Sequence, residues 1–395
     1  MMTFLLRMLA TTAIAESGVG VILPSGKYLT KGKKGKPSLE FHSWRTLLAI
    51  PFVPSLALGE AYARGTLIIH NGDLRDALMA LMASRRRGES VAQRMAMAWV
   101  VAGMRWKEGR GQKQSRHNVH HHYDLGNRFY ELFLDKDMQY SCAYFTHSTM
   151  SLDAAQEAKK THISKKLMLK RGLSVLDIGC GWGGMGLTLA KRYAAKVMGI
   201  TLSTQQQKRA TERAKQAKVK GVEFALRDYR AEKKTYDRIV SVGMFEHVGR
   251  RQFANYFACL DRLLKTDGIA LIHTIGSTKS SLGVDPFISK YIFPGGYIPK
   301  LSEMMKAVEA TNLRVTDIEV LHDHYAETLR HWHKRFMANR DKALAMFGGT
   351  FCRIWEFYLV GCELSFRYGS LVVYQLQLTH NKEIVPITRE YLYKN

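Results

Sequence analysis

The feature that most constrains the fold of this chain is a glycine-rich turn that directly follows an apolar stretch. The residues run Val175-Leu176-Asp177-Ile178-Gly179-Cys180-Gly181-Trp182-Gly183-Gly184. An apolar strand that enters such a turn and then a helix is typical of a nucleotide-binding βαβ unit. The glycines let the backbone approach a ligand closely, and the helix N-terminus adds partial positive charge. The segment therefore predicts an α/β domain with a nucleotide-like cofactor.

Alternating strand and helix patterns surround this turn, as expected for a parallel sheet. The predicted strands are Ser174–Ile178, Lys196–Thr201, Val222–Arg227, Asp237–Val242 and Gly268–Thr274, followed by two late strands near Arg314–Leu321 and Leu371–Leu378. Helices such as Thr204–Lys218 and Arg251–Leu264 fall between them. The fold class predicted is α/β, a doubly wound seven-stranded Rossmann-like sheet, preceded by a small mixed α+β domain.

Two details of the turn indicate which cofactor it binds. A dinucleotide site expects an acidic residue at the end of the second strand, yet that strand ends Gly199-Ile200-Thr201-Leu202-Ser203. Asp177 instead forms D-x-G-x-G, the first motif of the class I S-adenosylmethionine-dependent methyltransferases, which the sequence resembles. The alternative, a purely structural glycine turn, explains fewer of these glycines. Asp228 follows the third strand, where this fold commonly holds the adenine amine; a solvated turn is an equal reading from spacing alone.

The charge of the 395-residue chain suggests an anionic partner. Lys and Arg number 59 against 34 Asp and Glu, a formal net charge of +25, which favours a nucleic acid or an anionic membrane surface. Solubility alone is the alternative, but the basic residues are clustered. They are Lys31, Lys33, Lys34 and Lys36 in one group, and Arg85, Arg86, Arg87, Arg105, Lys107, Arg110, Lys113 and Arg116 in another.

The N-terminal part predicts a surface-bound protein rather than a spanning one. No run approaches the roughly 18 apolar residues of a transmembrane helix. Phe4, Leu5, Met8 and Leu9 favour a short amphipathic helix, because Arg7 interrupts the apolar stretch of a signal peptide. Five unpatterned cysteines indicate a reducing cytoplasm. We therefore predict a cytoplasmic protein, peripheral to the inner face of the membrane.

The domain organisation follows from these patterns. Residues 18–32 read as a hairpin that turns at Pro24-Ser25-Gly26, helical patterns follow near 43–50, 56–65 and 73–84, and residues 84–118 form a basic linker. We predict a small lipid-docking domain with its basic linker at 1–110, which is also a candidate dimerisation domain. The catalytic methyltransferase domain is predicted at 111–395.

Six ordered segments extend the resemblance to a particular family. They are His122-Tyr123-Asp124-Leu125-Gly126-Asn127, Tyr140-Ser141-Cys142-Ala143-Tyr144-Phe145, Met244-Phe245-Glu246-His247-Val248-Gly249, Leu271-Ile272-His273-Thr274-Ile275-Gly276, Phe293-Pro294-Gly295-Gly296 and His324-Tyr325-Ala326-Glu327-Thr328-Leu329. Together they resemble the cyclopropane-fatty-acyl-phospholipid synthase family, which includes the mycolic acid cyclopropane synthases. A weaker match lies at Leu56-Ala57-Leu58-Gly59-Glu60-Ala61-Tyr62.

The resemblance implies a reaction and its site residues. In that family bicarbonate is the base that removes a proton from the transferred methyl group. Its ligands correspond to Cys142, Glu246, His273 and Tyr325, with a backbone contact at Ile275. The cofactor contacts correspond to Tyr140, Ser141, Asp177, Gly179, Gly181, Thr201, Leu202, Gln206, Asp228 and Tyr229. The implied substrate is an unsaturated phospholipid in an anionic membrane.

The residue types suit this chemistry. An alkene is a weak nucleophile, so the methyl donor must be held in line in a dry pocket. Aromatic faces stabilise a developing carbocation by about 0.5–2 kcal/mol each, and Tyr140, Tyr144, Phe145 and Phe245 lie in the motif segments. Histidine, tyrosine and cysteine donate hydrogen bonds to a small oxyanion, and a carboxylate accepts its hydroxyl hydrogen.

Several alternatives stay open from the sequence. The same family gives methyl-branched or methylene products, and some plant relatives methylate amines. An RNA methyltransferase would suit the charge, but no recognition module or base-stacking motif is found, so no nucleic-acid partner is expected. A non-catalytic lipid-binding protein is the third alternative. His117, His120, His121 and His122 form a cluster, yet no partner stands at a known ligand spacing, so we predict no metal.

Overall fold

The computed structural model describes residues 17–50, 52–84, 125–279 and 283–393. These residues divide into two compact units. One unit contains the described residues of 17–84 together with 283–294 and 329–370, and the other contains 125–279, 295–328 and 371–393. The predicted boundary between residues 110 and 111 lies outside the described residues. So do the amphipathic stretch at 4–9, the second basic cluster and the four histidines at 117–122.

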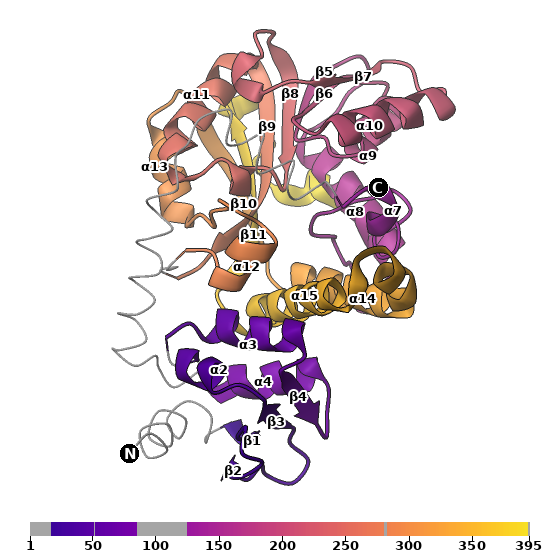
Figure 1. Ribbon diagram of the computed structural model, residues 1–395. Coiled ribbons are helices and arrows are strands. Elements are labelled where there is room, and N and C mark those ends of the chain that lie inside the picture. Colours follow the sequence, from indigo (N-terminus) through magenta and orange to yellow (C-terminus); the bar gives the residue numbers. More distant parts are fainter. Residues whose placement is uncertain (1–16, 51, 85–124, 280–282, 394–395) are drawn as a thin grey trace. The chain divides into compact units, whose positions relative to one another are not determined.

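The larger unit contains a seven-stranded sheet, labelled in Figure 1. Its strands are β5 (Ser174–Ile178), β6 (Lys196–Thr201), β7 (Val222–Leu226), β8 (Tyr236–Val242), β9 (Leu264–Ser277), β10 (Arg314–Leu321) and β11 (Leu371–Thr379). Their spatial order is β10-β11-β9-β8-β5-β6-β7. β11 is antiparallel to both of its neighbours, whereas β9, β8, β5, β6 and β7 are mutually parallel. The predicted α/β fold class is confirmed.

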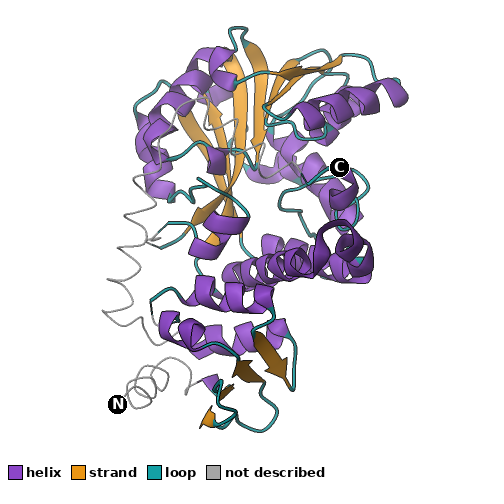
Figure 2. Cartoon of the chain, viewed as in Figure 1, coloured by secondary structure: helices purple, strands orange, loops and turns teal. Residues whose placement is uncertain are grey.

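The sheet strands are apolar on both faces because helices cover both sides, as Figure 2 shows. On one face Val175 packs with Ile163 of α8 (Leu152–Lys166) and Leu189 of α9 (Gly184–Tyr193). On the other face Leu176 packs in a cluster with residues of α11 (Phe253–Leu263) and α13 (Leu301–Glu309). Successive residues of one strand therefore support opposite layers, and α10 (Thr204–Gln216) follows β6.

The smaller unit contains a four-stranded sheet in the order β2-β1-β3-β4. Its elements are β1 (Gly20–Ile22), β2 (Tyr28–Thr30), β3 (Ser38–Phe41), α2 (Trp44–Ala49), α3 (Pro54–Arg64), β4 (Leu67–His70) and α4 (Leu74–Ser84). β1 and β2 pair antiparallel, so the predicted hairpin at 18–32 is confirmed. A left-handed Gly65 with φ of 72° ends α3, a conformation that glycine adopts without strain.

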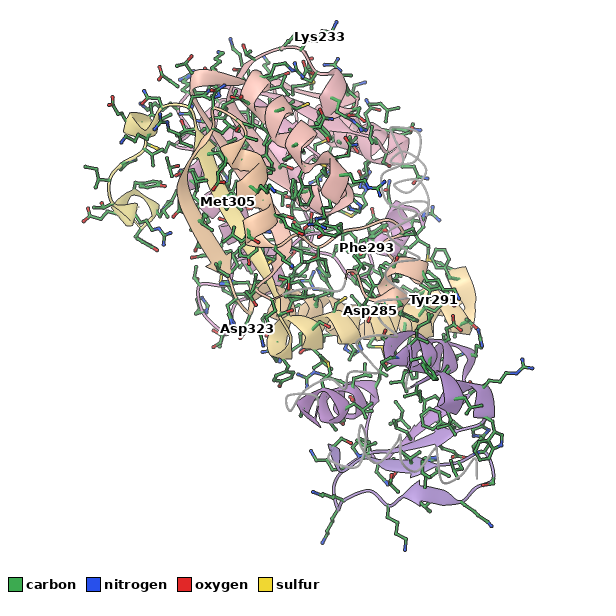
Figure 3. All side chains as sticks on the ribbon, turned by 90° about the vertical axis from the view of Figure 1, so that its left-hand side faces the viewer. Lys233, Asp285, Tyr291, Phe293, Met305 and Asp323 are labelled. Carbon is green, nitrogen blue, oxygen red and sulfur yellow. The ribbon has the colours of Figure 1, made fainter. Side chains whose placement is uncertain are left out.

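Two later helices belong to this smaller unit. They are α12 (Pro286–Tyr291) and α15 (Arg340–Tyr368), which is kinked at Gly348. Asp285 caps α12 by accepting the N–H of Phe287 at 2.9 Å, and the Tyr291 hydroxyl at the end of α12 donates to Glu60 at 2.9 Å; Figure 3 labels Asp285 and Tyr291. Dividing the chain at a single point between residues 110 and 111 does not predict that these two late helices join the N-terminal elements. Its cause is the apolar face of α15, which packs on α3 and α4.

Two properties bear on the membrane prediction. Lys31, Lys33, Lys34 and Lys36 are all exposed on the smaller unit. Within the described ranges, no helix combines the length and the apolar character needed to cross a bilayer.

Candidate active site

The glycine turn lies at the carboxyl end of β5, where parallel α/β sheets bind ligands. Gly179 has a φ of 80°, and a Cβ added there would lie 2.8 Å from the Cβ of Met244. A Cβ on Gly184, the first residue of α9, would lie 2.3 Å from the amide Nε2 of Gln139. These glycines therefore let the turn pack closely against Met244 and Gln139. A Cβ on Gly181 would meet nothing within 4 Å, so the cradle is open to a cofactor at that position.

Asp177 lies in β5 and is 2% exposed. Burial raises the pKa of its carboxyl group to about 7. Its Oδ2 atom has no hydrogen-bond partner among the described residues. A buried polar atom without a partner is rare in proteins, so this oxygen is a candidate acceptor for a bound group.

The end of β6 brings three predicted cofactor contacts together. The Thr201 hydroxyl donates to Oε1 of Gln206 at 2.9 Å. Ser203 caps α10 by accepting the backbone N–H of Gln206 at 3.3 Å. Leu202 lies between Thr201 and this cap. The residues of the strand end are thereby held in one arrangement beside the glycine turn.

The predicted adenine contact differs from expectation in one respect. Asp228 is 5% exposed, so the solvated-turn reading is wrong. However, the Arg230 guanidinium donates to both Asp228 oxygens, from Nε at 2.8 Å and from Nη2 at 2.6 Å. The Tyr229 ring packs edge-on against Tyr256 at 5.3 Å. Asp228 therefore already carries an arginine partner.

The segment that contains Tyr140, Ser141 and Cys142 is fixed by α8. Gln156 donates from Nε2 to the backbone oxygen of Ser141 at 2.9 Å. The Lys159 ammonium donates to Oγ of Ser141 at 2.8 Å. The Tyr140 ring packs edge-on against Tyr130 at 5.3 Å. Gln156 and Lys159 were not predicted from the sequence; their spacing on one helix face is the only signal that points to them.

Glu246 and Ile275 meet directly. Glu246 lies in the short helix η4 (Phe245–His247) that follows β8, and its Oε1 accepts the backbone N–H of Ile275 in β9 at 2.6 Å. Its Oε2 atom is buried without a partner in the described part of the chain. Burial raises the pKa of the Glu246 carboxyl group to about 7. The group is thus poised to change its protonation state near neutral pH.

His273 lies two residues before Ile275 and is 2% exposed. The Gln375 amide donates from Nε2 to Nδ1 of the imidazole at 3.1 Å. Burial holds the pKa of His273 well below its usual range, so the ring is neutral. When Nδ1 accepts, the proton sits on Nε2, and no described residue bonds to that Nε2. His273 therefore presents a buried N–H donor.

The first turn of α14 (His324–Ala338), which carries Tyr325, is bonded to the segment that follows Cys142. Thr328 accepts the backbone N–H of Ala143 at 3.0 Å, and Nδ1 of His324 accepts that of Phe145 at 2.9 Å. Cys142 is 1% exposed, and burial raises the pKa of its thiol, so it stays protonated. The Tyr325 side chain is also buried.

Two of the four aromatic residues noted in the motif segments, Tyr144 and Phe245, have close ring contacts. The Tyr144 ring is stacked between His162 at 4.3 Å and His324 at 5.0 Å. Phe245 is fully buried and packs against Phe253 at 4.5 Å. Tyr144 is thus stacked on two histidine rings, and Phe245 belongs to the core.

The described residues contain no group of three or more histidine, cysteine, aspartate or glutamate side chains placed to hold a metal ion. The site consists of a glycine cradle, acidic oxygens without partners among the described residues, and buried donors. With the seven-stranded sheet, this defines a class I S-adenosylmethionine-dependent methyltransferase.

Comparison with known proteins identifies the family. The family model described as mycolic acid cyclopropane synthetase matches residues 110–376, and the chain belongs to this family. It is 41% identical over 283 residues to the cyclopropane-fatty-acyl-phospholipid synthase of Escherichia coli, covering 72% of this chain and 73% of that protein. It is 39% identical over 279 residues to a tuberculostearic acid methyltransferase of Mycobacterium tuberculosis, covering 67% and 65%.

Solved structures agree with this assignment. The structure of a cyclopropane synthase from Mycobacterium tuberculosis matches with a TM-score of 0.64 at 33% identity, covering 67% of this chain and 97% of that one. A mycolic acid cyclopropane synthase complexed with SAH and CTAB matches with a TM-score of 0.63 at 34% identity, with the same coverage. The protein is therefore an S-adenosylmethionine-dependent enzyme of this family.

Proposed function

We propose that this enzyme is a cyclopropane-fatty-acyl-phospholipid synthase, which adds a methylene from S-adenosylmethionine across the cis double bond of an unsaturated phospholipid chain, with bound bicarbonate as the base. The observation that carries the proposal is a pair of buried, unpartnered polar atoms of opposite kind. One belongs to Glu246, which bonds to Ile275, and the other to His273, two residues before Ile275. Oε2 of Glu246 is an acceptor, and Nε2 of His273 is a donor, within the described residues. A small oxyanion that carries one hydroxyl needs both.

The protonation states support these roles. The Cys142 thiol and the His273 imidazole are both neutral because burial disfavours their charged forms. Neither therefore competes as a base; His273 presents its Nε2–H, whereas the Cys142 thiol donates to the backbone oxygen of Ala143 at 3.3 Å. Glu246, with a pKa of about 7, accepts the hydroxyl hydrogen of bicarbonate when it is ionised. Tyr325 is the further donor at the first turn of α14. These four residues would hold bicarbonate, which would supply the base for the proton whose loss closes the ring.

The cofactor residues serve the first step. Bound adenosylmethionine supplies an electrophilic methyl group. The glycine cradle, which is open at Gly181, would let the cofactor approach the backbone, and the buried Asp177 lies in the strand before it. Thr201 and Gln206 fix the end of β6. These residues hold the methyl donor in line and exclude water, as the weak nucleophilicity of an alkene demands.

A methyl-branched product is the second candidate, because a relative at 39% identity is named for tuberculostearic acid. Ring closure needs a base for the transferred methyl group, and all four proposed bicarbonate ligand side chains are present. This set favours the ring. An RNA methyltransferase and a non-catalytic lipid-binding protein fit the family less well.

We further propose that the smaller unit docks the enzyme on the inner face of an anionic membrane and that it also forms homodimers. Trp44 and Leu48 of α2 and Phe52, which lies in the turn after this helix, are exposed by 37%, 45% and 59%. The exposed lysines at 31–36 lie on the same unit. Apolar side chains with nearby positive charge are typical of peripheral membrane binding.

One experiment tests the central proposal. The protein is incubated with methyl-labelled adenosylmethionine and vesicles of an unsaturated phosphatidylglycerol, with and without bicarbonate. Mass spectrometry measures the mass gain, and proton NMR distinguishes ring protons from a branch methyl. We expect ring formation that depends on bicarbonate. A branched product would favour the second candidate, and lipid that gains no label would overturn both. RNA added in place of vesicles tests the remaining alternative.

A further inference from the structure

Lys159 is a fully buried lysine whose side chain the proposed reaction does not use. It lies on α8 with no exposed surface. Its Nζ atom donates to Oε1 of Gln139 at 2.7 Å and to Oγ of Ser141 at 2.8 Å. Both partners are neutral. Burying an ammonium group costs considerable free energy unless a charge or a function compensates for it.

The neighbouring buried lysines of α8 are paired differently. Lys160 lies 2.7 Å from Asp137 and 3.0 Å from Glu157. Lys166 lies 3.0 Å from Asp317 and 2.6 Å from Glu319. Among the described residues, Lys159 has no such carboxylate partner within 4.0 Å. It therefore has no direct ion pair beside the predicted site residues Ser141 and Cys142, although the buried Asp135 carboxylate acts on its charge from farther away.

The hydrogen bond to Ser141 sets the direction of the serine hydroxyl. An ammonium group has only donors, so Ser141 accepts from Lys159 and its own hydrogen must point elsewhere. The nearby positive charge polarises that O–H bond and strengthens any bond it makes to an anion. Burial lowers the pKa of Lys159 to about 8, so the ammonium keeps its proton at neutral pH. Ser141 is therefore prepared to donate to an anionic oxygen.

The segment around Ser141 lies against the cofactor cradle. The Gln139 amide lies so close to the first residue of α9 that a Cβ at position 184 would be 2.3 Å from its Nε2 atom. Gln156 holds the backbone oxygens of Gln139 and Ser141 at 3.2 and 2.9 Å. We infer that Lys159 is the buried countercharge for the carboxylate of S-adenosylmethionine and acts through the hydroxyl of Ser141. This inference rests on the proposed role of Ser141 as a cofactor contact, and it makes Lys159 a positioning residue.

Paired ligands test the inference without lipid turnover. Calorimetry measures the affinity of the full-length protein for S-adenosylmethionine and for its decarboxylated form at pH 7, at a fixed bicarbonate concentration. The ratio of the two affinities reports the carboxylate interaction alone. Lys159→Met keeps the length of the buried stem but removes the charge. We expect it to lower affinity for adenosylmethionine by at least tenfold, as for a charged hydrogen bond, and to leave the decarboxylated ligand nearly unaffected.

Lys160→Met is the matched control, because it removes a neighbouring buried charge that already has carboxylate partners. Its affinity ratio should stay at the wild-type value. If Lys159→Met weakens both ligands equally, Lys159 has a structural role and the inference is wrong. The same holds if neither affinity changes, or if only the bicarbonate dependence of turnover changes.

A second variant keeps the test decisive if Lys159→Met does not fold. Ser141→Ala retains the lysine and removes the hydroxyl, so it should also reduce the affinity ratio by several-fold. A wild-type ratio in Ser141→Ala would overturn the inference. The outcome is independent of the product: a protein that forms no cyclopropane lipid but shows the carboxylate effect would refute the proposed function alone.

Discussion

Oε1 of Glu246 accepts a 2.6 Å hydrogen bond from the backbone N–H of Ile275. This bond connects the turn after β8 to the part of β9 that carries His273 and Ile275. The second carboxyl oxygen is left buried without a partner in the described residues. One oxygen thus positions the side chain, while the other is free to accept the hydroxyl hydrogen of an oxyanion. Structural and chemical roles are divided between the two oxygens of one carboxyl group.

This division predicts the effect of Glu246→Gln. The amide oxygen retains the bond to Ile275, but the side chain no longer ionises or accepts at both positions. We expect turnover to fall by about 10²–10⁴-fold, the range for loss of proton-transfer assistance, with adenosylmethionine affinity within about threefold of wild type. Lipid mass spectrometry and calorimetry measure the two quantities. Glu212→Gln, on the exposed side of α10, is the control. An equal loss of turnover and affinity would indicate a structural role for Glu246.

The same variant should be more stable than the wild type at alkaline pH. The pKa of Glu246 is about 7 in the folded protein against 4.5 ordinarily. The folded state therefore binds the extra proton between these values, and the group costs stability increasingly as pH rises through this window. We expect Glu246→Gln to gain about 1–3 kcal/mol in unfolding free energy at pH 8 and little at pH 5. Urea unfolding at both pH values measures this. A gain that is equal at the two values would contradict the assignment.

Gln375 is expected to control the tautomer of His273. Its amide donates to Nδ1 and thereby keeps the ring proton on Nε2. Gln375→Met removes the donor at similar volume, so the anion-binding tautomer loses its preference. We expect the bicarbonate concentration needed for half-maximal rate to rise roughly tenfold, as for one lost hydrogen bond. The affinity for adenosylmethionine should change little. Steady-state rates across a bicarbonate series measure the effect. Rates that saturate at the wild-type bicarbonate concentration would refute it.

Thr328 links the Cys142 segment to α14 and gives a further test. Its Oγ1 accepts the buried N–H of Ala143 and donates to the backbone oxygen of His324 at 2.7 Å. Thr328→Val keeps the shape but leaves that N–H unsatisfied, which costs about 1–3 kcal/mol. Turnover should also fall, because Tyr325 is carried by the same helical turn. Thr328→Ser retains the hydroxyl and should preserve both properties. Unfolding midpoints and product yield measure them; loss in the serine variant would point to the methyl group instead.

Much of the fold was predictable because the sheet strands are buried on both faces and read as apolar runs. β5, β6 and β10 match the predicted ranges to the residue. β9 extends from Leu264 to Ser277, beyond the predicted 268–274, because charged residues at its start mask the strand pattern. The helix α15 was not predicted to join the N-terminal elements. Its packing on α3 and α4 depends on contacts between segments about 290 residues apart, such as Arg75 with Glu363.

The site was predictable as a set of residues but not as a set of contacts. The motif positions indicated Cys142, Glu246 and His273, yet the partners that fix their side chains come from distant segments. Gln375 reaches His273 across two antiparallel strands. Lys159 reaches Ser141 from the next helix. Such pairings depend on tertiary register, which local patterns do not specify. The ion pair of Asp228 and Arg230 is different. These residues are only two positions apart, so the sequence alone could have indicated their contact.

The proposed membrane surface leads to a test that is independent of the active site. Leu48 and Phe52 are exposed apolar side chains on the smaller unit. Their joint replacement, Leu48→Ser with Phe52→Ser, removes apolar area that would enter the bilayer interface, at about 1–3 kcal/mol. We expect at least tenfold weaker sedimentation with anionic vesicles and unchanged binding of adenosylmethionine. Ile387→Ser, which removes a fully exposed apolar side chain from the larger unit, is the matched control. If both variants weaken vesicle binding equally, the smaller unit is not the docking surface, and charge reversal of Arg85, Arg86 and Arg87 would then be expected to have no effect either.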